Sequence, residues 1–161
     1  MSVSHEAVEG LYRQLGPALL AYARSLVRDR GEAEDVLQQV FLKLMTAPAE
    51  AWPREPRPYL FRAVRNACLN RRRSTLRETV RLETAPMFHA PNGHETLAAD
   101  LGAALQELPD EQREVVMLRV WGEMTTEATA EVLGVPANTV ASRYRYALAK
   151  LRQHFGASVR S

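Results

Sequence analysis

Residues Gly134–Arg152 read GVPANTVASRYRYALAKLR and form the most informative segment of the 161-residue chain. On a helix of about 3.6 residues per turn, one side of this segment is apolar and can pack on a partner helix. The apolar members are Val140, Tyr144, Ala147, Leu148 and Leu151. The opposite side presents Asn138, Ser142, Arg145, Tyr146 and Ala149, with Arg143 and Arg152 at its edges. We therefore expect an amphipathic helix whose outer side is polar and basic.

A shorter helical pattern over Thr125–Leu133 precedes this segment and stops at Gly134. Two helices joined by a glycine-containing turn, the second with Arg, Ser, Asn and Tyr on its outer side, are typical of a helix-turn-helix. A plain helical hairpin with solvated arginines gives the same pattern. The remainder of the chain has to distinguish between these two interpretations.

Charged residues are unevenly distributed, although the formal net charge is +2. Residues 54–77 contain eight arginines and one acidic residue, and residues 81–131 contain ten acidic residues and three arginines. Residues 132–161 contain five basic residues and no acidic one. Two basic blocks separated by an acidic segment favour two contacts with a polyanion. Solvated helix faces explain the acidic segment equally well, but they account less well for the run Arg71–Arg73.

The single cysteine, Cys68, excludes an internal disulfide and indicates a reducing compartment. Because it lies beside the apolar side of its predicted helix, we expect a buried core residue rather than a reactive thiol. No apolar run approaches the roughly 20 residues of a membrane span, and the N-terminus has no signal-peptide pattern. We therefore expect a cytoplasmic protein without membrane insertion.

The residues of catalytic chemistry do not occur in recognisable arrangements. There is no nucleophile–base pair, metal-ligand cluster or glycine-rich phosphate loop, so we expect neither an enzyme nor a bound cofactor. His89 and His94 have no cysteine or carboxylate cluster around them, so we expect no metal site.

Composition and periodicity predict an all-α fold, because no segment alternates with period two and strong helix formers dominate. Outside the helix-turn-helix, helices are expected over Val8–Val27, Gly31–Met45, Tyr59–Arg73 and Pro109–Trp121, with a further one from near Leu97. Gly16 and Pro17 should kink or break the first helix. Asp29 and Glu32 should form a capping box for the second, and Pro109 should occupy position N1 of its helix.

The helix Gly31–Met45 has a strongly amphipathic pattern. Its buried side should consist of Ala33, Val36, Leu37, Val40, Phe41 and Leu44. The opposite side presents Asp35, Gln38, Gln39 and Leu42. A leucine among polar residues is a candidate protein-contact residue, although single exposed leucines also occur on any surface.

Residues 46–58 contain four prolines and should form a stiff loop rather than a regular element. Trp52 in this loop either stacks on a base or anchors the loop on the core. The helix that follows should bury Leu60, Ala63, Val64, Ala67 and Cys68, and expose Arg62, Arg65, Asn66, Leu69 and Arg73. Evenly spaced guanidinium groups suit contacts with phosphates and base edges.

Residues 78–99 lose helical periodicity and collect prolines, an asparagine and a glycine, which predicts a flexible linker. The linker would separate two small helical domains, residues 1–77 and 100–161. A chain of this length can form one ordinary domain or two small ones. With a linker of about 20 residues, we expect the domains to move independently when free.

Three blocks of the sequence together resemble the small two-domain bacterial sigma factors of RNA polymerase, the extracytoplasmic-function (ECF) class. The blocks are AEDVLQQVFLKL (33–44), similar to region 2.2; PYLFRAVRNACLNRRR (58–73), similar to regions 2.3–2.4; and LPDEQREVVMLRVWGEMTTEATAEVLGVPANTVASRYRYALAKLR (108–152), similar to region 4. Tyr59 stands where a tryptophan is common, and Asn66 matches the usual asparagine. The third block contains the family's LP-x-x-x-R opening, LGV turn and TV-x-SR recognition helix.

This resemblance implies a non-enzymatic promoter-specificity subunit that recruits core RNA polymerase, in response to a stress or another signal. The proposed polymerase-binding residues are Asp35, Gln38, Gln39 and Leu42, which would dock on the β′ clamp helices. Region 4 would also contact the β flap, and the linker would run toward the active-site and RNA-exit channels. An anti-sigma factor is a further expected partner.

The resemblance also implies two contacts with promoter DNA. The 46–58 loop would capture a base flipped out of the −10 element, and the helix 59–73 would hold the melted strand. The −10 candidates are Trp52, Arg62, Arg65, Asn66, Arg72 and Arg73. The helix 137–151 would enter the major groove at the −35 element. The −35 candidates are Asn138, Ser142, Arg143, Arg145 and Tyr146.

The chain departs from the family pattern in region 4. The family usually has Ser/Thr-x-x-Glu-Ile-Ala in the first helix of the motif, whereas Ala128 and Thr129 occupy the Glu and Ile positions here. The lost capping-box contact and the buried hydroxyl should each cost on the order of 1 kcal/mol, so we expect a marginally stable second domain. Ala141 and Tyr146 stand where many relatives have arginine. The −35 sequence therefore cannot be inferred from relatives.

Two other interpretations remain open from the sequence. The chain could be a stand-alone helix-turn-helix regulator with residues 1–77 as an effector or dimerisation domain, but such a protein needs no polymerase-docking helix. It could also be a sigma-mimicking decoy that binds an anti-sigma protein, but a decoy has no use for the basic block 54–77.

Overall fold

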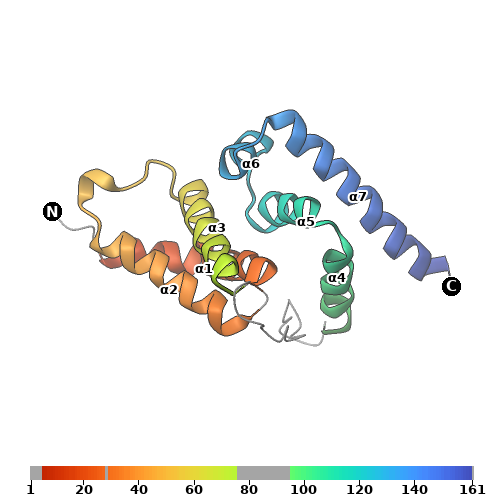
Figure 1. The fold of residues 1–161 in the computed structure, drawn as a ribbon, viewed down its shortest axis with the longest axis horizontal. Helices are drawn as coiled ribbons and strands as arrows, with labels where there is room; N and C mark the ends of the chain where they lie inside the picture. The colour runs from red at the N-terminus through yellow and green to blue at the C-terminus, as the bar shows by residue number, and fades with distance from the viewer. Residues whose placement is uncertain (1–4, 28, 76–94, 161) are drawn as a thin grey trace. The chain divides into compact units, whose positions relative to one another are not determined.

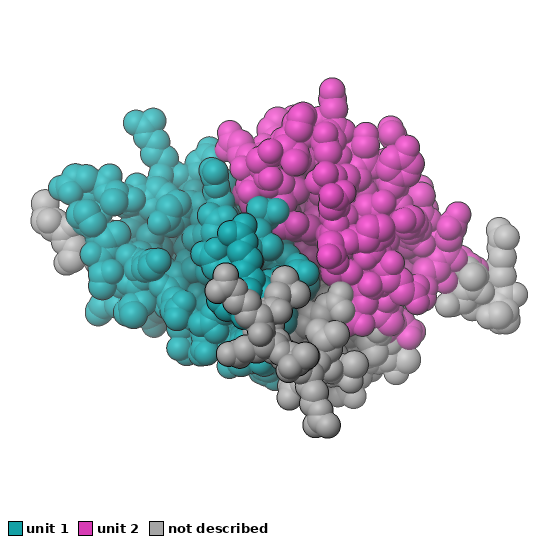
Figure 2. Space-filling model, in the orientation of Figure 1, with its two compact units in different colours: residues 1–85 teal, residues 86–161 magenta. Residues whose placement is uncertain are grey.

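The computed structural model describes residues 5–27, 29–75 and 95–160, and the regular elements in these ranges are all helices (Figure 1). The predicted all-α class is therefore confirmed. The chain divides into two compact units, residues 1–85 and residues 86–161 (Figure 2). Among the described residues, no helix has both the length and the apolar character that a membrane span requires. His89, His94 and residues 78–94 of the predicted linker lie outside the described ranges.

Unit 1 is built from α1 (His5–Val27), α2 (Arg30–Thr46) and α3 (Pro56–Thr75), each of which packs on the other two. Its centre contains the fully buried rings of Tyr22 and Phe61, with centroids 5.6 Å apart. Cys68 is also fully buried, as predicted. Sequence reasoning missed Phe61, because α3 packs on two helices and buries a wider stripe than an i, i+3, i+4 pattern indicates.

The predicted break at Gly16 and Pro17 does not occur, since α1 continues through Pro17. A proline inside a helix removes one backbone hydrogen bond and costs about 3 kcal/mol. Leu15 and Leu19, on either side of Pro17, are both buried. The packing of α1 against α2 and α3 therefore offsets the local cost of the proline.

The start of α2 confirms Asp29 as the N-cap, but the partner differs from the predicted capping box. Asp29 Oδ1 accepts a hydrogen bond from the amide of Gly31 at 2.9 Å, rather than from Glu32 at position N3. The six residues of the predicted apolar side are all buried: Ala33, Val36, Leu37, Val40, Phe41 and Leu44. This side fixes which residues of α2 face outward.

The proline-rich loop is shorter than predicted. A 3₁₀ helix, η1 (Ala49–Ala51), lies within it, and α3 begins at Pro56, three residues before the predicted start at Tyr59. Pro56 and Pro58 fit the first turn of α3 because the amides of that turn have no intrahelical partner. The prolines therefore begin a helix here rather than exclude one.

Unit 2 contains α4 (Glu95–Glu107), α5 (Asp110–Val116), η2 (Met117–Trp121), α6 (Thr126–Leu133) and α7 (Ala137–Arg160). Helix α4 thus begins within the range predicted as linker. Pro109 is the N-cap of α5 and not its N1 residue, because helical geometry begins at Asp110. Helix α7 extends to Arg160, beyond the predicted end of its apolar pattern near Leu151.

The predicted helix over residues 109–121 is α-helical only as far as Val116. Residues Met117–Trp121 form a π-helix, in which the Gly122 amide donates to the Met117 carbonyl at 2.9 Å. Val120 lies within this wider turn and is 47% exposed. A Cβ at Gly122 would lie 2.5 Å from the Leu118 carbonyl oxygen, so only glycine fits this turn.

The helix-turn-helix is confirmed as α6, a short turn and α7. Gly134 ends α6 in the left-handed region with φ of 68°, which glycine adopts without strain. Thr125 caps α6 by accepting from the Ala128 amide at 3.0 Å. The fully buried Thr129 hydroxyl donates to the Thr125 carbonyl at 2.8 Å. This hydroxyl therefore has a partner, and its burial costs less than an unpaired hydroxyl would.

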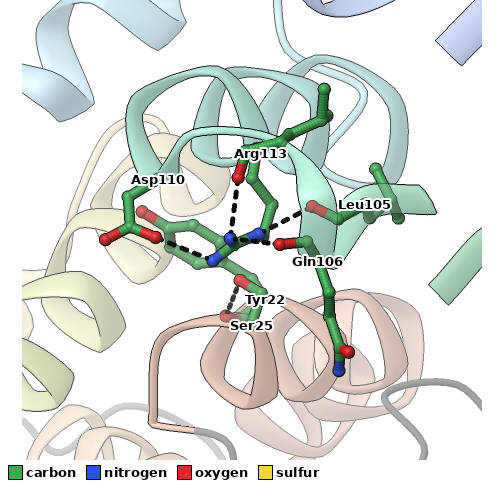
Figure 3. A network of polar contacts seen from close by, with 7 residues as sticks. Tyr22, Ser25, Leu105, Gln106, Asp110 and Arg113 are labelled. Carbon is green, nitrogen blue, oxygen red and sulfur yellow. Dashed lines mark hydrogen bonds and ion pairs between the residues drawn. The ribbon is translucent and has the colours of Figure 1, made fainter. Parts of the chain in front are cut away.

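Arg113 joins the end of α4 to the start of α5 (Figure 3). Arg113 is 6% exposed, and its guanidinium donates to the backbone carbonyls of Leu105, Gln106 and Leu108 at 2.9 to 3.1 Å. It also forms an ion pair with Asp110 at 3.0 Å. The carbonyls at a helix C-terminus have no intrahelical donor, so this one side chain both caps α4 and neutralises part of its dipole.

Candidate nucleic-acid interface

The outer side of α7 is held in place by a small apolar core. Val140 is fully buried together with Val115 of α5 and Ala130 of α6, and Tyr144 packs against this cluster. The Arg119 guanidinium lies 5.1 Å from the centroid of the Tyr144 ring, within cation–π distance. Because α7 is anchored on both α5 and α6, the side chains on its other side have a fixed direction.

The predicted −35 residues occupy that other side to different degrees. Asn138 and Arg145 are exposed, Tyr146 is 58% exposed, and Ser142 is partly buried. The Arg145 guanidinium lies 5.7 Å from the Tyr146 ring centroid. This contact orients a cation and an aromatic ring on the same exposed surface, where they can meet a base edge and a sugar or phosphate.

Arg143 differs from the other four candidates. It lies at the edge of α7 nearest α5, and its Nη2 is 3.5 Å from Oε2 of Glu111. The Arg143 side chain is 25% exposed and that of Glu111 is 73% exposed. Sequence reasoning gave no indication of this pair, because the two residues are far apart in the chain.

The second basic surface lies on α3. Arg62, Asn66, Arg72 and Arg73 are exposed, and Arg65 is partly buried. Helical geometry places Arg62, Arg65, Asn66 and Arg73 on one side, with Leu69 in the turn between Asn66 and Arg73. Trp52 is partly buried in the loop that leads into α3, and its amide donates to the Ala49 carbonyl at 3.2 Å. The loop with Trp52 directly precedes the arginine-bearing helix in the chain.

The polar side of α2 is exposed as predicted. Asp35, Gln38 and Gln39 are exposed, and the Leu42 side chain is 60% exposed. Arg71 Nη1 of α3 lies 3.8 Å from Asp35 Oδ2. This ion pair joins the edge of the α2 surface to the arginine-rich end of α3, a relationship that the sequence does not indicate.

Arg24 of α1 is a buried charged residue of unit 1. Burial lowers the pKa of its guanidinium, the positive charge of Arg30 lowers it further, and the carboxylate of Glu34 opposes the decrease. Arg24 is 8% exposed, so its position suits a structural role rather than a contact with a ligand. No group of three or more metal-binding side chains occurs within the described ranges.

Both units match known protein families. Residues 11–78 match the model of sigma-70 region 2, and residues 98–151 match the model of sigma-70 region 4. The RNA polymerase sigma-E factor of Streptomyces coelicolor is 37% identical over 147 residues, which cover 84% of this chain and 78% of that protein. The ECF RNA polymerase sigma factor SigL of Mycobacterium tuberculosis is 30% identical over 154 residues, 90% of this chain and 86% of that protein.

Solved structures agree with the sequence matches. The sigma factor RpoE, in its co-crystal structure with the anti-sigma factor NepR from Bartonella quintana, gives a TM-score of 0.74 at 25% identity and covers 92% of this chain and 96% of that chain. CnrH, solved in complex with the cytosolic domain of CnrY, gives a TM-score of 0.65 at 25% identity over 96% of this chain and 90% of that chain.

Proposed function

The chain belongs to the sigma-70 family, in its ECF class, and we propose that its two units contact two separate elements of a promoter. As an RNA polymerase sigma factor it directs core RNA polymerase to promoters and initiates transcription. The observation that supports two contacts is one exposed, arginine-bearing helix in each matched region, α3 in region 2 and α7 in region 4. We place the protein in the cytoplasm and assign it no catalytic activity of its own.

Unit 2 is proposed to bind the −35 element through α7. An α-helix fits the major groove, and side chains on its outer side then reach base edges. Arg145 and Asn138 have the donor groups for this contact, and both are exposed. Tyr146 and Ser142 border them, whereas Arg143 at the edge of α7 is suited to the phosphate backbone.

Unit 1 is proposed to hold the −10 element after melting. Unstacking a base costs a few kcal/mol of free energy. Contacts with an aromatic and polar pocket can offset this cost. The loop with Trp52 offers the aromatic surface, and the arginines and Asn66 on α3 offer donors to the strand. The residues assigned to this contact are Trp52, Arg62, Arg65, Asn66, Arg72 and Arg73.

The exposed side of α2 is proposed to bind core polymerase at the β′ clamp helices, and unit 2 to bind the β flap. Leu42 would be the apolar member of the α2 contact, at the C-terminal end of the row that Asp35, Gln38 and Gln39 begin. An exposed apolar residue beside polar ones is a candidate for an energetically important contact. We also propose that an anti-sigma factor regulates the protein, because two of its structural relatives were solved with such a protein or with a partner's cytosolic domain.

The experiment that tests this proposal adds the full chain to sigma-free core polymerase and maps transcription start sites on genomic DNA. We expect new start sites that share upstream −10 and −35 sequences. A stand-alone regulator would bind DNA without creating start sites on core polymerase. A decoy would do neither, and either result would reject the proposal.

A further inference from the structure

The ion pair between Arg143 and Glu111 places a carboxylate beside the proposed DNA-binding helix. Glu111 lies in the first turn of α5, and its carboxylate is 3.5 Å from the Arg143 guanidinium. The Glu111 side chain is 73% exposed and that of Arg143 is 25% exposed, so water screens the pair and its contribution to folding stability is small. A carboxylate in the first turn of α5 also interacts favourably with the helix dipole, independently of Arg143.

The pair has a direct consequence for DNA binding. A phosphate that contacts Arg143 would lie within a few ångströms of the Glu111 carboxylate, well inside the Debye length of about 10 Å at 0.1 M salt. Like charges at that distance repel each other. Arg143 must also leave Glu111, or share its donors, before it can bind a phosphate.

We propose that Glu111 limits the affinity of unit 2 for DNA by neutralising Arg143. In this role Glu111 weakens the contact of Arg143 with a phosphate, a contact that does not depend on the DNA sequence. The contacts of Arg145 and Asn138 with bases stay unchanged. Glu111 therefore lowers the affinity of unit 2 for any DNA, whereas the ratio of affinities for the −35 element and for other sequences stays the same, because the phosphate contact is common to both complexes. The inference rests on the proposed function of α7 as the DNA-binding helix.

The experiment uses holoenzyme assembled from the full chain and core polymerase. Its two probes are a promoter duplex from the start-site experiment and the same duplex with the −35 element scrambled. Affinity is measured between about 50 and 200 mM salt, where each added phosphate contact steepens the slope of log K against log salt by about 0.9. For E111Q we expect tighter binding to both duplexes at low salt. Between about 50 and 200 mM salt, the affinity of E111Q should also fall about 3.5-fold more than that of the wild type.

Two further variants distinguish the loss of the Arg143–Glu111 ion pair from a general change in the charge of unit 2. Glu131→Gln removes another exposed carboxylate of unit 2, from α6, and should keep the wild-type salt slope. Adding Arg143→Ala to E111Q should return the slope to that of Arg143→Ala alone. Unfolding curves of each variant show whether a change in stability accompanies the change in binding.

The results distinguish the inference from the proposed function. If wild-type holoenzyme does not prefer the promoter duplex, the proposed function fails. If it does, but E111Q has the slope of Glu131→Gln, then Glu111 does not neutralise Arg143 and the inference is wrong. Weaker binding by E111Q would also overturn it, because Glu111 would then hold Arg143 in a productive position.

Discussion

Arg113 Nε donates a hydrogen bond to the backbone carbonyl of Leu105 at 2.9 Å, across the corner between α4 and α5. The same guanidinium satisfies the carbonyls of Gln106 and Leu108 and pairs with Asp110. Arg113 is the arginine of the LP-x-x-x-R opening of region 4. Its contacts give that motif a physical role, since one buried cation fixes the angle at which the first two helices of unit 2 meet.

Replacing Arg113 with alanine should destabilise unit 2 by about 1–3 kcal/mol, because the carbonyls of Leu105, Gln106 and Leu108 lose the guanidinium as a donor and its ion pair with the exposed Asp110 is broken. Chemical denaturation of a Trp52→Phe background, in which Trp121 is the remaining tryptophan, measures this directly. The exposed Arg152→Ala should change stability by less than about 0.5 kcal/mol. A similarly small effect of Arg113→Ala would show that water replaces the guanidinium without cost.

The missing capping-box glutamate of α6 offers a stabilising substitution. Thr125 already caps the Ala128 amide, and Ala128 is at N3, where a glutamate can reach back to the Thr125 amide. Ala128→Glu should therefore stabilise unit 2 by about 0.3–1.5 kcal/mol. Ala128→Gln keeps the hydrogen bond without the charge and should retain most of the gain. If only the glutamate stabilises, the helix dipole and not the capping box is responsible.

Changing Leu42 to glutamate should weaken the binding of core polymerase by about tenfold or more, because an apolar contact residue is replaced by a charge. Leu42 is 60% exposed, so the fold should be retained, as thermal unfolding can verify. Gln14→Glu adds the same charge at an exposed position of α1 and should leave core binding unchanged. Unchanged affinity of Leu42→Glu would mean that another surface docks on the polymerase.

Replacing Arg145 with alanine should reduce discrimination among −35 sequences by about 1–3 kcal/mol if this side chain contacts a base. Competition binding of holoenzyme to a library of −35 variants measures the change at each position. Arg152→Ala, at the edge of α7, should instead weaken binding to all sequences alike. A uniform loss for Arg145→Ala as well would reassign Arg145 to the phosphate backbone.

Local sequence signals predicted much of this fold. The apolar side of α2, the turn at Gly134 and the two helices around it follow from periodicity and from backbone preferences of single residues. Family resemblance added the assignment of roles to these helices. The exposure of Leu42, Arg145 and Tyr146 agrees with their predicted helical sides.

The features that were not predicted depend on contacts between residues that a local sequence pattern does not relate to one another. The pairs Arg71–Asp35 and Arg143–Glu111 each join helices that meet only in the folded unit. The uninterrupted α1 at Pro17 reflects packing that outweighs a local cost. The buried Thr129 hydroxyl was expected to be costly, because a sequence does not show that a carbonyl of the preceding turn accepts its hydrogen bond.

In the proposed function, unit 1 holds the melted −10 strand and unit 2 binds the −35 duplex. Permanganate reactivity of promoter thymines, measured per bound holoenzyme, tests this most directly. The variant with Arg62→Ala and Asn66→Ala in α3 should lower reactivity near the −10 element by about tenfold, because two contacts of about 0.5–1.5 kcal/mol each are lost. Arg145→Ala should lower occupancy but not reactivity per bound complex. Wild-type reactivity in the α3 variant would contradict the account.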